Sequence, residues 1–160
     1  INGGTPKYSV SLIIPKKNKR TIDAIQKAIE EAKEDGLNTK FGGKLPKKFY
    51  NPLRDGDEER EDDPVYAGSY FINASANENR KPGLVYGNGQ PIIDPTDFYS
   101  GCWGRASISF YAFNTNGNAG IGCGLNNLMK TRDDEPLGGA PVKAEDDFAD
   151  FIDKDDDFLD

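Results

Sequence analysis

The sequence predicts a mainly β protein, a partly open five-stranded β-barrel covered by one α-helix and followed by a disordered acidic tail. Three observations lead to this prediction. Short segments of period two recur between glycine-rich turns, one segment has the periodicity of a helix, and nine of the last sixteen residues are acidic. Short strands joined by glycine-rich turns are typical of small β-barrels. At 160 residues the chain is long enough for one domain with a modest core.

The most informative segment is 99–114, YSGCWGRASISFYAFN, which alternates with period two. As a strand it directs one set of side chains to each face. The small and apolar set suits a core and comprises Cys102, Gly104, Ala106, Ile108, Phe110 and Ala112. The opposite set is aromatic, basic and hydroxylic and comprises Trp103, Arg105, Ser107, Ser109, Tyr111 and Phe113. Flat rings beside a guanidinium fit stacked bases and phosphates. A half-buried strand covered by another element gives the same pattern, because aromatic residues favour strands.

A hairpin turn, NTNGN at 114–118, follows this strand and predicts a return strand over 119–125. If residues 116 and 117 form its centre, Phe110 lies opposite Cys123, Tyr111 opposite Gly122, and Cys102 opposite Thr131. The two cysteines of the chain are therefore predicted to be unpaired. Glycines alternate along the return strand and share the face of the aromatic set, which predicts an open glycine floor against which bases could lie.

The N-terminal third begins with a predicted strand, YSVSLII at 8–14, which Pro15 ends. A predicted helix follows over 21–35, because apolar residues recur there at helical spacing. Thr21 is a candidate N-cap and Gly36 a candidate stop signal. A further strand is predicted around 70–72, and a short hairpin with arms at 84–86 and 92–93. Residues 128–142 are predicted to be loop.

Two charged segments lie between these elements. The segment 37–53 carries basic residues among aromatic rings, as in loops that grip a nucleic-acid strand, although an ordinary surface loop has the same composition. Its candidate contacts are Lys40, Lys44, Lys47 and Lys48. The acidic segment 54–63, RDGDEEREDD, lacks the spacing of a calcium-binding EF-hand loop. The chain has no histidine, and we expect neither a metal site nor a cofactor.

Charge is distributed unevenly along the chain, whose formal net charge is −7. Residues 1–53 carry six more basic than acidic residues, whereas residues 145–160 carry eight more acidic than basic ones. Such asymmetry is typical of a body that binds polyanions and a tail that binds partners. The tail is too polar to fold alone, yet it contains apolar anchors. Its candidate partner-binding residues are Phe148, Phe151, Asp155, Asp156, Asp157 and Phe158.

The sequence resembles a known family, the single-stranded DNA-binding proteins of tailed bacteriophages. Four segments carry the resemblance: GGTPKYSVSLIIPK at 3–16, PLRDGDEER at 52–60, YSGCWGRASISFYAFN at 99–114, and GIGCGLNNLMKTRDDEPLGG at 120–139. The resemblance implies an OB-fold that binds single-stranded DNA without strong sequence preference during phage replication or recombination. It also implies a tail that contacts replication or recombination proteins, and a place of action in the cytoplasm of the infected or lysogenic host.

We therefore expect an OB-fold DNA-binding domain over 1–144 and an acidic tail over 145–160. Members of the family look as if they have a further strand before Gly3, and we expect that strand to be missing here. No membrane contact is expected, and the sequence leaves the oligomeric state open. Two other functions fit the residues less well. A scaffolding protein would use the aromatic strand to join subunits. A metal-dependent nuclease would use Asp55, Asp57 and Glu58.

Overall fold

A computed structural model gives the fold of the protein, and it describes residues 7–115 and 117–137. The strands are β1 (Lys7–Pro15), β2 (Arg54–Asp55), β3 (Ser69–Asn77), β4 (Gly83–Tyr86), β5 (Trp103–Thr115) and β6 (Asn118–Arg132). The helices are α1 (Lys19–Thr39) and the single turn α2 (Gly56–Glu59), with 3₁₀ turns at Pro64–Tyr66 and Pro95–Asp97. The predicted class, mainly β with one main helix, is confirmed. Predictions for the tail lie outside the described residues.

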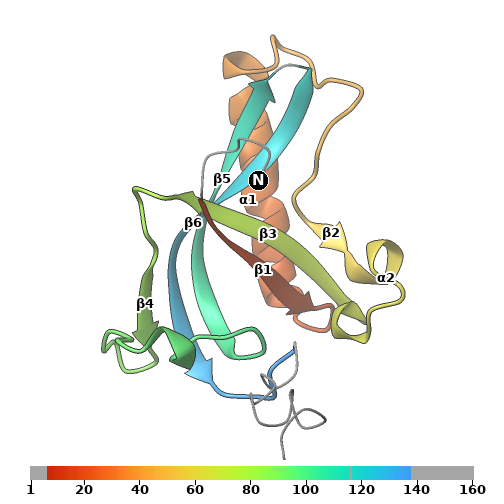
Figure 1. Cartoon of the computed structure of the whole chain (residues 1–160). Helices are drawn as coiled ribbons and strands as arrows, with labels where there is room; N and C mark the ends of the chain where they lie inside the picture. The colour runs from red at the N-terminus through yellow and green to blue at the C-terminus, as the bar shows by residue number, and fades with distance from the viewer. Residues whose placement is uncertain (1–6, 116, 138–160) are drawn as a thin grey trace, which may run out of the picture.

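All six strands belong to one sheet that bends around the core (Figure 1). The strand order is β1-β3-β6-β4, with β2 added to β3 and β5 added to β6. β1 is antiparallel to β3, β3 is parallel to β6, and β6 is antiparallel to β5, so β1 and β5 run in the same direction. Within the described residues β1 pairs only with β3, and β5 only with β6. In the described residues, β1 and β5 therefore each have one edge without a strand partner, and both strands line the same groove.

The core lies between α1 and the inner face of the sheet. Ile72 and Ala74 from β3 are fully buried there, together with Cys123 and Leu125 from β6 and Ile22 from α1. The alternation predicted for segment 119–125 is confirmed, since its odd-numbered apolar side chains are the buried ones. These side chains hold the sheet and the helix together by excluding water from the space between them.

The helix α1 is longer than predicted at both ends. Asn18, not Thr21, precedes its first turn, and its side chain makes no capping hydrogen bond. Gly36 does not end the helix but lies buried within it. A Cβ atom at Gly36 would lie 2.5 Å from the Cβ atom of Ala112 on β5. The glycine thus allows the C-terminal end of α1 to lie directly against β5, and the helix continues to Thr39.

The register predicted for the β5–β6 hairpin is confirmed over most of its length. Phe110 pairs with Cys123, and Tyr111 pairs with Gly122. Two irregularities, at Ser107/Ile108 and at Trp103/Gly104, shift the pairing toward the start of β5. Trp103 consequently lies opposite Arg132. The prediction that Cys102 lies opposite Thr131 is wrong, because the pairing begins at Trp103 and Cys102 precedes the paired strand.

Three other boundaries differ from the predictions. β6 continues to Arg132, although residues 128–132 were predicted to be loop, because β4 pairs in parallel with residues 127–130 and extends the strand. The first arm of the short hairpin forms β4, but its second arm contributes only an isolated bridge, Val85 to Pro91. β3 spans nine residues, since its full length pairs with β1.

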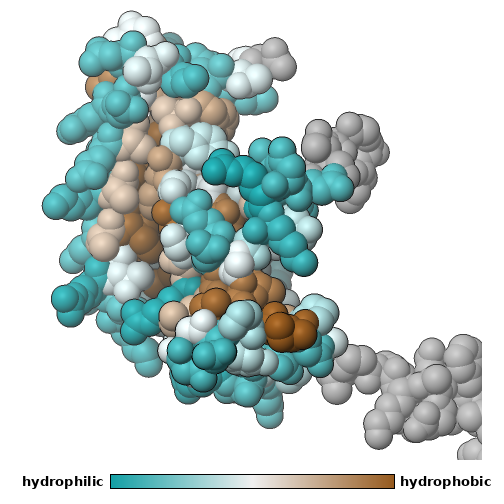
Figure 2. Space-filling model, turned by 90° about the vertical axis from the view of Figure 1, so that its left-hand side faces the viewer, coloured by the Kyte–Doolittle hydropathy of each residue, from teal (hydrophilic) through white to brown (hydrophobic). Residues whose placement is uncertain are grey.

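A groove of about 2720 Å³ lies between the free edges of β1 and β5, with α1 along one side. Apolar side chains dominate its interior, and Figure 2 shows an apolar band in a hollow that hydrophilic side chains border. Val10 and Leu12 line it from β1, Ile25 and Ala28 from α1, and Ile108 from β5. No helix of the described part of the chain is both long and apolar enough to cross a membrane.

Candidate nucleic-acid interface

The outward face of β5 carries the side chains that the sequence predicted for it. Trp103 and Tyr111 are 39% and 50% exposed, and Arg105 between them is also exposed. The opposite face of the strand packs on the core through Ala106, Ile108 and Phe110. Tyr111 lies eight positions after Trp103, which is about 27 Å along a strand. The face therefore has two aromatic ends with Arg105 between them, rather than one continuous cluster.

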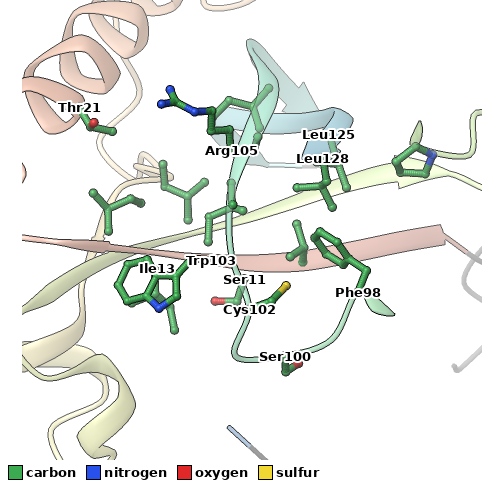
Figure 3. Close-up of a pocket in the computed structure, with 18 of the residues that line it drawn as sticks. Ser11, Ile13, Thr21, Phe98, Ser100, Cys102, Trp103, Arg105, Leu125 and Leu128 are labelled. Atoms are coloured by element: carbon green, nitrogen blue, oxygen red, sulfur yellow. The ribbon is translucent and has the colours of Figure 1, made fainter. Parts of the chain in front are cut away.

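At the first end, Trp103 is held by one residue at the end of β6 and one residue just after that strand. The guanidinium of Arg132 lies 4.5 Å from the centre of the indole ring, and the indole Nε1–H donates a 2.8 Å hydrogen bond to the Asp134 carboxylate. This hydrogen bond, followed by one from the Glu135 amide, holds the pKa of Asp134 below its ordinary value. Figure 3 shows Trp103 and Arg105 beside the groove, with Thr21 of α1 on its other side.

A polar network fixes the segment that carries Asp134. The Tyr99 hydroxyl lies 2.9 Å from both the Asp133 carboxylate and the Asp134 carbonyl oxygen, and it accepts a hydrogen bond from the Asp134 amide. Lys130 donates to Asp133 at 2.8 Å and to the carbonyl oxygen of Asp97 at 2.9 Å. The Asp133 and Asp134 carboxylates therefore both have partners within the protein.

At the second end, Tyr111 lies over the glycines of β6. A Cβ atom at Gly122 would lie only 2.4 Å from Cζ of the Tyr111 ring. A Cβ atom at Gly120 would lie 2.5 Å from the carbonyl oxygen of Tyr50. The prediction of an open glycine floor is therefore wrong, because a ring and a backbone of the protein itself cover it. Trp103 also lies at the far end of the hairpin from these glycines.

The basic loop lies beside the tip of the same hairpin. The Asn114 side-chain amide donates a 3.1 Å hydrogen bond to the carbonyl oxygen of Lys40, which ties the loop to the end of β5. Phe41 is buried and packs edge-on against Phe49, with 5.5 Å between ring centres. Phe113 is half-buried opposite Gly120. The loop lysines are all exposed, namely Lys40, Lys44, Lys47 and Lys48.

The structure thus places the predicted residues in two groups. Trp103 and Arg105 lie beside the groove at the start of β5. Tyr111 and Phe113 belong to the end of β5, where the anchored loop begins at Lys40. The acidic tail, with its predicted partner-binding residues, lies outside the described part of the chain.

Sequence reasoning missed Arg132, Asp134 and Tyr99 as neighbours of Trp103. Residues 125–132, LNNLMKTR, lack period-two alternation, so no pattern indicated that the strand continues to Arg132. The contact of Asp134 with the indole depends on the path of the chain after β6, which local sequence does not determine. The one available signal was the run of charged residues at 132–135, directly after the LNNLMKT segment.

The acidic segment 54–63 has a structural role that its composition did not indicate. The Lys16 ammonium lies 2.8 Å from the carboxylates of both Asp55 and Asp57. Asp57 also accepts a 2.9 Å hydrogen bond from the Gly68 amide, and Arg54 forms an ion pair with Glu59. In residues 7–115 and 117–137, the structure groups no three histidine, cysteine, aspartate or glutamate side chains as a metal site would require. Asp55 and Asp57 therefore join the end of β1 to the β2–α2 segment.

A bent β sheet with aromatic and basic side chains along an exposed strand is the arrangement of proteins that hold single strands of nucleic acid. Comparison with known proteins agrees with this class. The chain belongs to the family described as Enterobacter phage Enc34, ssDNA-binding protein, whose family model matches residues 1–159. It is also 30% identical over 158 residues to a putative protein p50 of Acyrthosiphon pisum secondary endosymbiont phage 1, covering 92% of this chain and 81% of that protein.

Solved structures of phage proteins have the same fold. The single-stranded DNA-binding protein of bacteriophage Enc34, in complex with ssDNA, is similar with a TM-score of 0.69 and 27% identity over 84% of this chain and 76% of that chain. Bacteriophage T7 gp2.5, a single-stranded DNA-binding protein, is similar with a TM-score of 0.54 and 20% identity, covering 93% of this chain and 83% of that one. The second likeness concerns the fold alone.

Proposed function

We propose that the protein binds single-stranded DNA of a bacteriophage without sequence preference and protects it during replication or recombination. The observation that carries this proposal is the outward face of β5, where Trp103, Arg105 and Tyr111 are exposed in a chain that belongs to a family of ssDNA-binding proteins. Exposed rings offer stacking to any base, because every base has an aromatic face. The lysines of the loop beside the hairpin tip add phosphate contacts that carry no sequence information.

The test is binding of a fluorescently labelled dT oligomer by anisotropy over a series of salt concentrations. Trp103, the only tryptophan, reports on the same surface through its fluorescence. We expect binding with quenching of Trp103, and affinity that falls with salt at a slope of about −0.7 per phosphate neutralised. A folded protein that does not bind the oligomer at low salt would show that the proposal is wrong.

A scaffolding protein is the second candidate, because the groove between β1 and β5 leaves apolar side chains and strand edges available to another chain. This candidate predicts a stable oligomer in light scattering and no salt-dependent affinity for DNA. The ssDNA proposal is better supported by the family and by the exposed aromatic and basic side chains on β5.

We do not propose an enzyme. The nuclease alternative needed Asp55 and Asp57 to bind a divalent cation, but the Lys16 ammonium lies between their carboxylates and supplies the positive charge. A cation at the same place would be repelled by Lys16. Incubation of single-stranded DNA with the protein and Mg²⁺ tests this directly, and appearance of cleavage products would restore the nuclease alternative.

We also propose that residues 1–144 form the DNA-binding domain and that a further strand completes it. Because β1 and β5 run in the same direction, one strand antiparallel to both would join their free edges. It would close a five-stranded ring with β1, β3, β6 and β5, as in an OB-fold. Amide hydrogen exchange tests this proposal, because amides on the free edges of β1 and β5 should be protected where a further strand pairs with them. Rapid exchange of these amides would argue against the strand.

For the tail, we propose that residues 145–160 bind replication or recombination proteins of the phage or its host. Its acidic residues and interspersed phenylalanines support this proposal, since acid with apolar anchors is typical of docking peptides. The corresponding place of action is the cytoplasm of the infected or lysogenic host. Copurification of a replication protein with the full chain, but not with a chain that ends at 144, is the expected result.

A further inference from the structure

We propose that Asp134 is a positioning residue for DNA binding, which fixes the Trp103 indole so that its exposed part is ready to stack on a base, while Arg132 supports the ring and neutralises a phosphate. This inference rests on the proposed function and assigns roles within the same surface. The two residues approach the indole in different ways. Asp134 binds its Nε1–H edge at 2.8 Å, and the Arg132 guanidinium lies over the ring at 4.5 Å from its centre.

The double contact restricts an otherwise mobile side chain. Trp103 is the first residue of β5 and is 39% exposed, so packing alone leaves its ring partly free to rotate. A hydrogen bond to the edge and a cation against the ring fix both torsions of the side chain. A ring that is already ordered loses less conformational entropy when a base stacks on it, so binding is tighter.

The support of Asp134 is itself rigid. The Tyr99 hydroxyl accepts a hydrogen bond from the Asp134 amide and has the Asp134 carbonyl oxygen and the Asp133 carboxylate as acceptors at 2.9 Å, so the backbone of this segment is anchored to Tyr99. The Leu137 amide donates a 3.0 Å hydrogen bond to the Ser100 carbonyl oxygen, which keeps the following segment against the turn before β5. A Cβ atom at Gly101 would lie 2.4 Å from the Glu135 carbonyl oxygen, so the two segments are in close contact.

Charge alone predicts the opposite effect for Asp134. A carboxylate beside a surface that binds phosphates repels them, so its removal should strengthen binding. If positioning dominates, loss of the Asp134 side chain should weaken binding despite the loss of a negative charge. The two effects can be separated, because an asparagine at this position can still accept the indole hydrogen bond but carries no charge.

The experiment compares Asp134→Ala, Asp134→Asn and Glu135→Ala with the unchanged chain, by dT-oligomer anisotropy at one fixed low salt concentration. Glu135 is the matched control, since it is exposed and its side chain forms no hydrogen bond or ion pair among the described residues. We expect about fivefold weaker binding for Asp134→Ala, and binding equal to or up to about twofold tighter than the unchanged chain for the other two variants. Equal tightening by all three variants would overturn the proposal.

Trp103 fluorescence provides a readout that a purely structural role would not change. Without DNA, the indole should be more mobile in Asp134→Ala than in Asp134→Asn, and its steady-state fluorescence anisotropy should be lower. The two variants should have the same urea midpoint. Unchanged indole anisotropy would overturn the positioning role. Trp103→Phe keeps a ring but removes the N–H donor, and it remains usable if Asp134→Ala does not fold. It should bind more weakly than the unchanged chain, and unchanged affinity would overturn the proposal.

Arg132 is tested by a second pair of variants. Arg132→Lys keeps the charge but lacks the flat guanidinium, whereas Arg132→Gln removes the charge. The salt slope should become shallower by about 0.7 in Arg132→Gln only. Equal slopes in both variants would show that Arg132 binds no phosphate. If the unchanged chain itself fails to bind the oligomer, the proposed function is wrong. If it binds and the variants do not differ, only the positioning inference is wrong.

Discussion

The Tyr111 ring lies directly over Gly122, its partner across the β5–β6 hairpin, so closely that a methyl group at Gly122 would be 2.4 Å from Cζ of the ring. The ring covers the glycine and remains 50% exposed. Glycine in a strand lowers stability, so it needs a compensating reason. Here the reason is an aromatic ring of the protein, which is held flat and open to solvent.

Gly122→Ala should therefore weaken DNA binding by displacing Tyr111. We expect a five- to tenfold loss of affinity, which is the lower end of the ~1–3 kcal/mol that stacking on one ring contributes. Stability should change by less than about 1 kcal/mol, because alanine favours the strand while the displaced ring loses contacts. Urea unfolding and dT-oligomer anisotropy measure the two effects separately.

Gly124→Ala is the matched control for this prediction. The nearest atom to a Cβ atom there is the Ser109 carbonyl oxygen at 3.6 Å, an ordinary contact. This variant should be as stable as the unchanged chain or more stable by about 0.5 kcal/mol, with the same DNA affinity. An equal loss of affinity in both variants would show that Tyr111 has no special part in binding.

The hairpin shows what the sequence could predict. Period-two alternation and the NTNGN turn were sufficient to place Tyr111 opposite Gly122 and to distinguish the two faces of β5. Both signals are local, and register follows from them because one face must be buried. What covers the glycines could not be predicted, since Tyr50 reaches Gly120 only through the tertiary fold.

The first end of β5 and the helix show where local signals fail. Gly36 has the position of a helix stop, but close packing of α1 against Ala112 requires a glycine there and the helix continues. Similarly, the contacts of Trp103 with Arg132 and Asp134 depend on a register shift and on the chain after β6. Such contacts are set by packing between segments that are distant in the sequence, and no short pattern encodes them.

Replacement of all four loop lysines by glutamine should reduce the salt dependence of DNA binding. If each of Lys40, Lys44, Lys47 and Lys48 neutralises one phosphate, the slope of log affinity against log salt should become shallower by about 2.8. Lys27 on α1 is exposed and has no ion-pair partner among the described residues, so Lys27→Gln should leave the slope unchanged. An unchanged slope in the fourfold variant would exclude the loop from the binding surface.

Stability should fall in acid through the carboxylates that bind Lys16. Hydrogen bonds from the Lys16 ammonium hold the pKa of Asp55 and of Asp57 below the ordinary value of 3.8. A lowered folded-state pKa means that the folded state binds fewer protons than the unfolded state. The stabilisation is therefore complete above pH 3.8 and is lost as pH falls through the lowered pKa values.

Lys16→Met tests this pH dependence, because it keeps the aliphatic stem of the side chain and removes its charge. Urea midpoints should be lower than those of the unchanged chain near neutral pH, and the difference should shrink as the medium is acidified below pH 3.8. A difference that stays constant down to the acid limit would show that packing of the side chain, not its charge, is responsible.

The two cysteines should differ in reactivity in the folded protein. Cys123 is 4% exposed, and burial raises the pKa of its thiol to about 11, so little thiolate is present near neutral pH. Cys102 is half-buried and lines the groove, as Figure 3 shows. A maleimide reagent should label Cys102 first and Cys123 only after unfolding, as mass spectrometry of the peptides can establish. Rapid labelling of native Cys123 would contradict its burial.

Deletion of residues 145–160 should strengthen DNA binding at low salt. The tail carries nine acidic residues and one lysine, so it resembles a short stretch of phosphates and should compete for the basic surface. Because salt screens this competition, the affinities of the full and shortened chains should converge as salt increases. The matched variant replaces the tail phenylalanines by serine and keeps every charge, and it should bind DNA like the full chain. Equal affinity of the full and shortened chains at low salt would rule out self-competition and leave partner binding as the role of the tail.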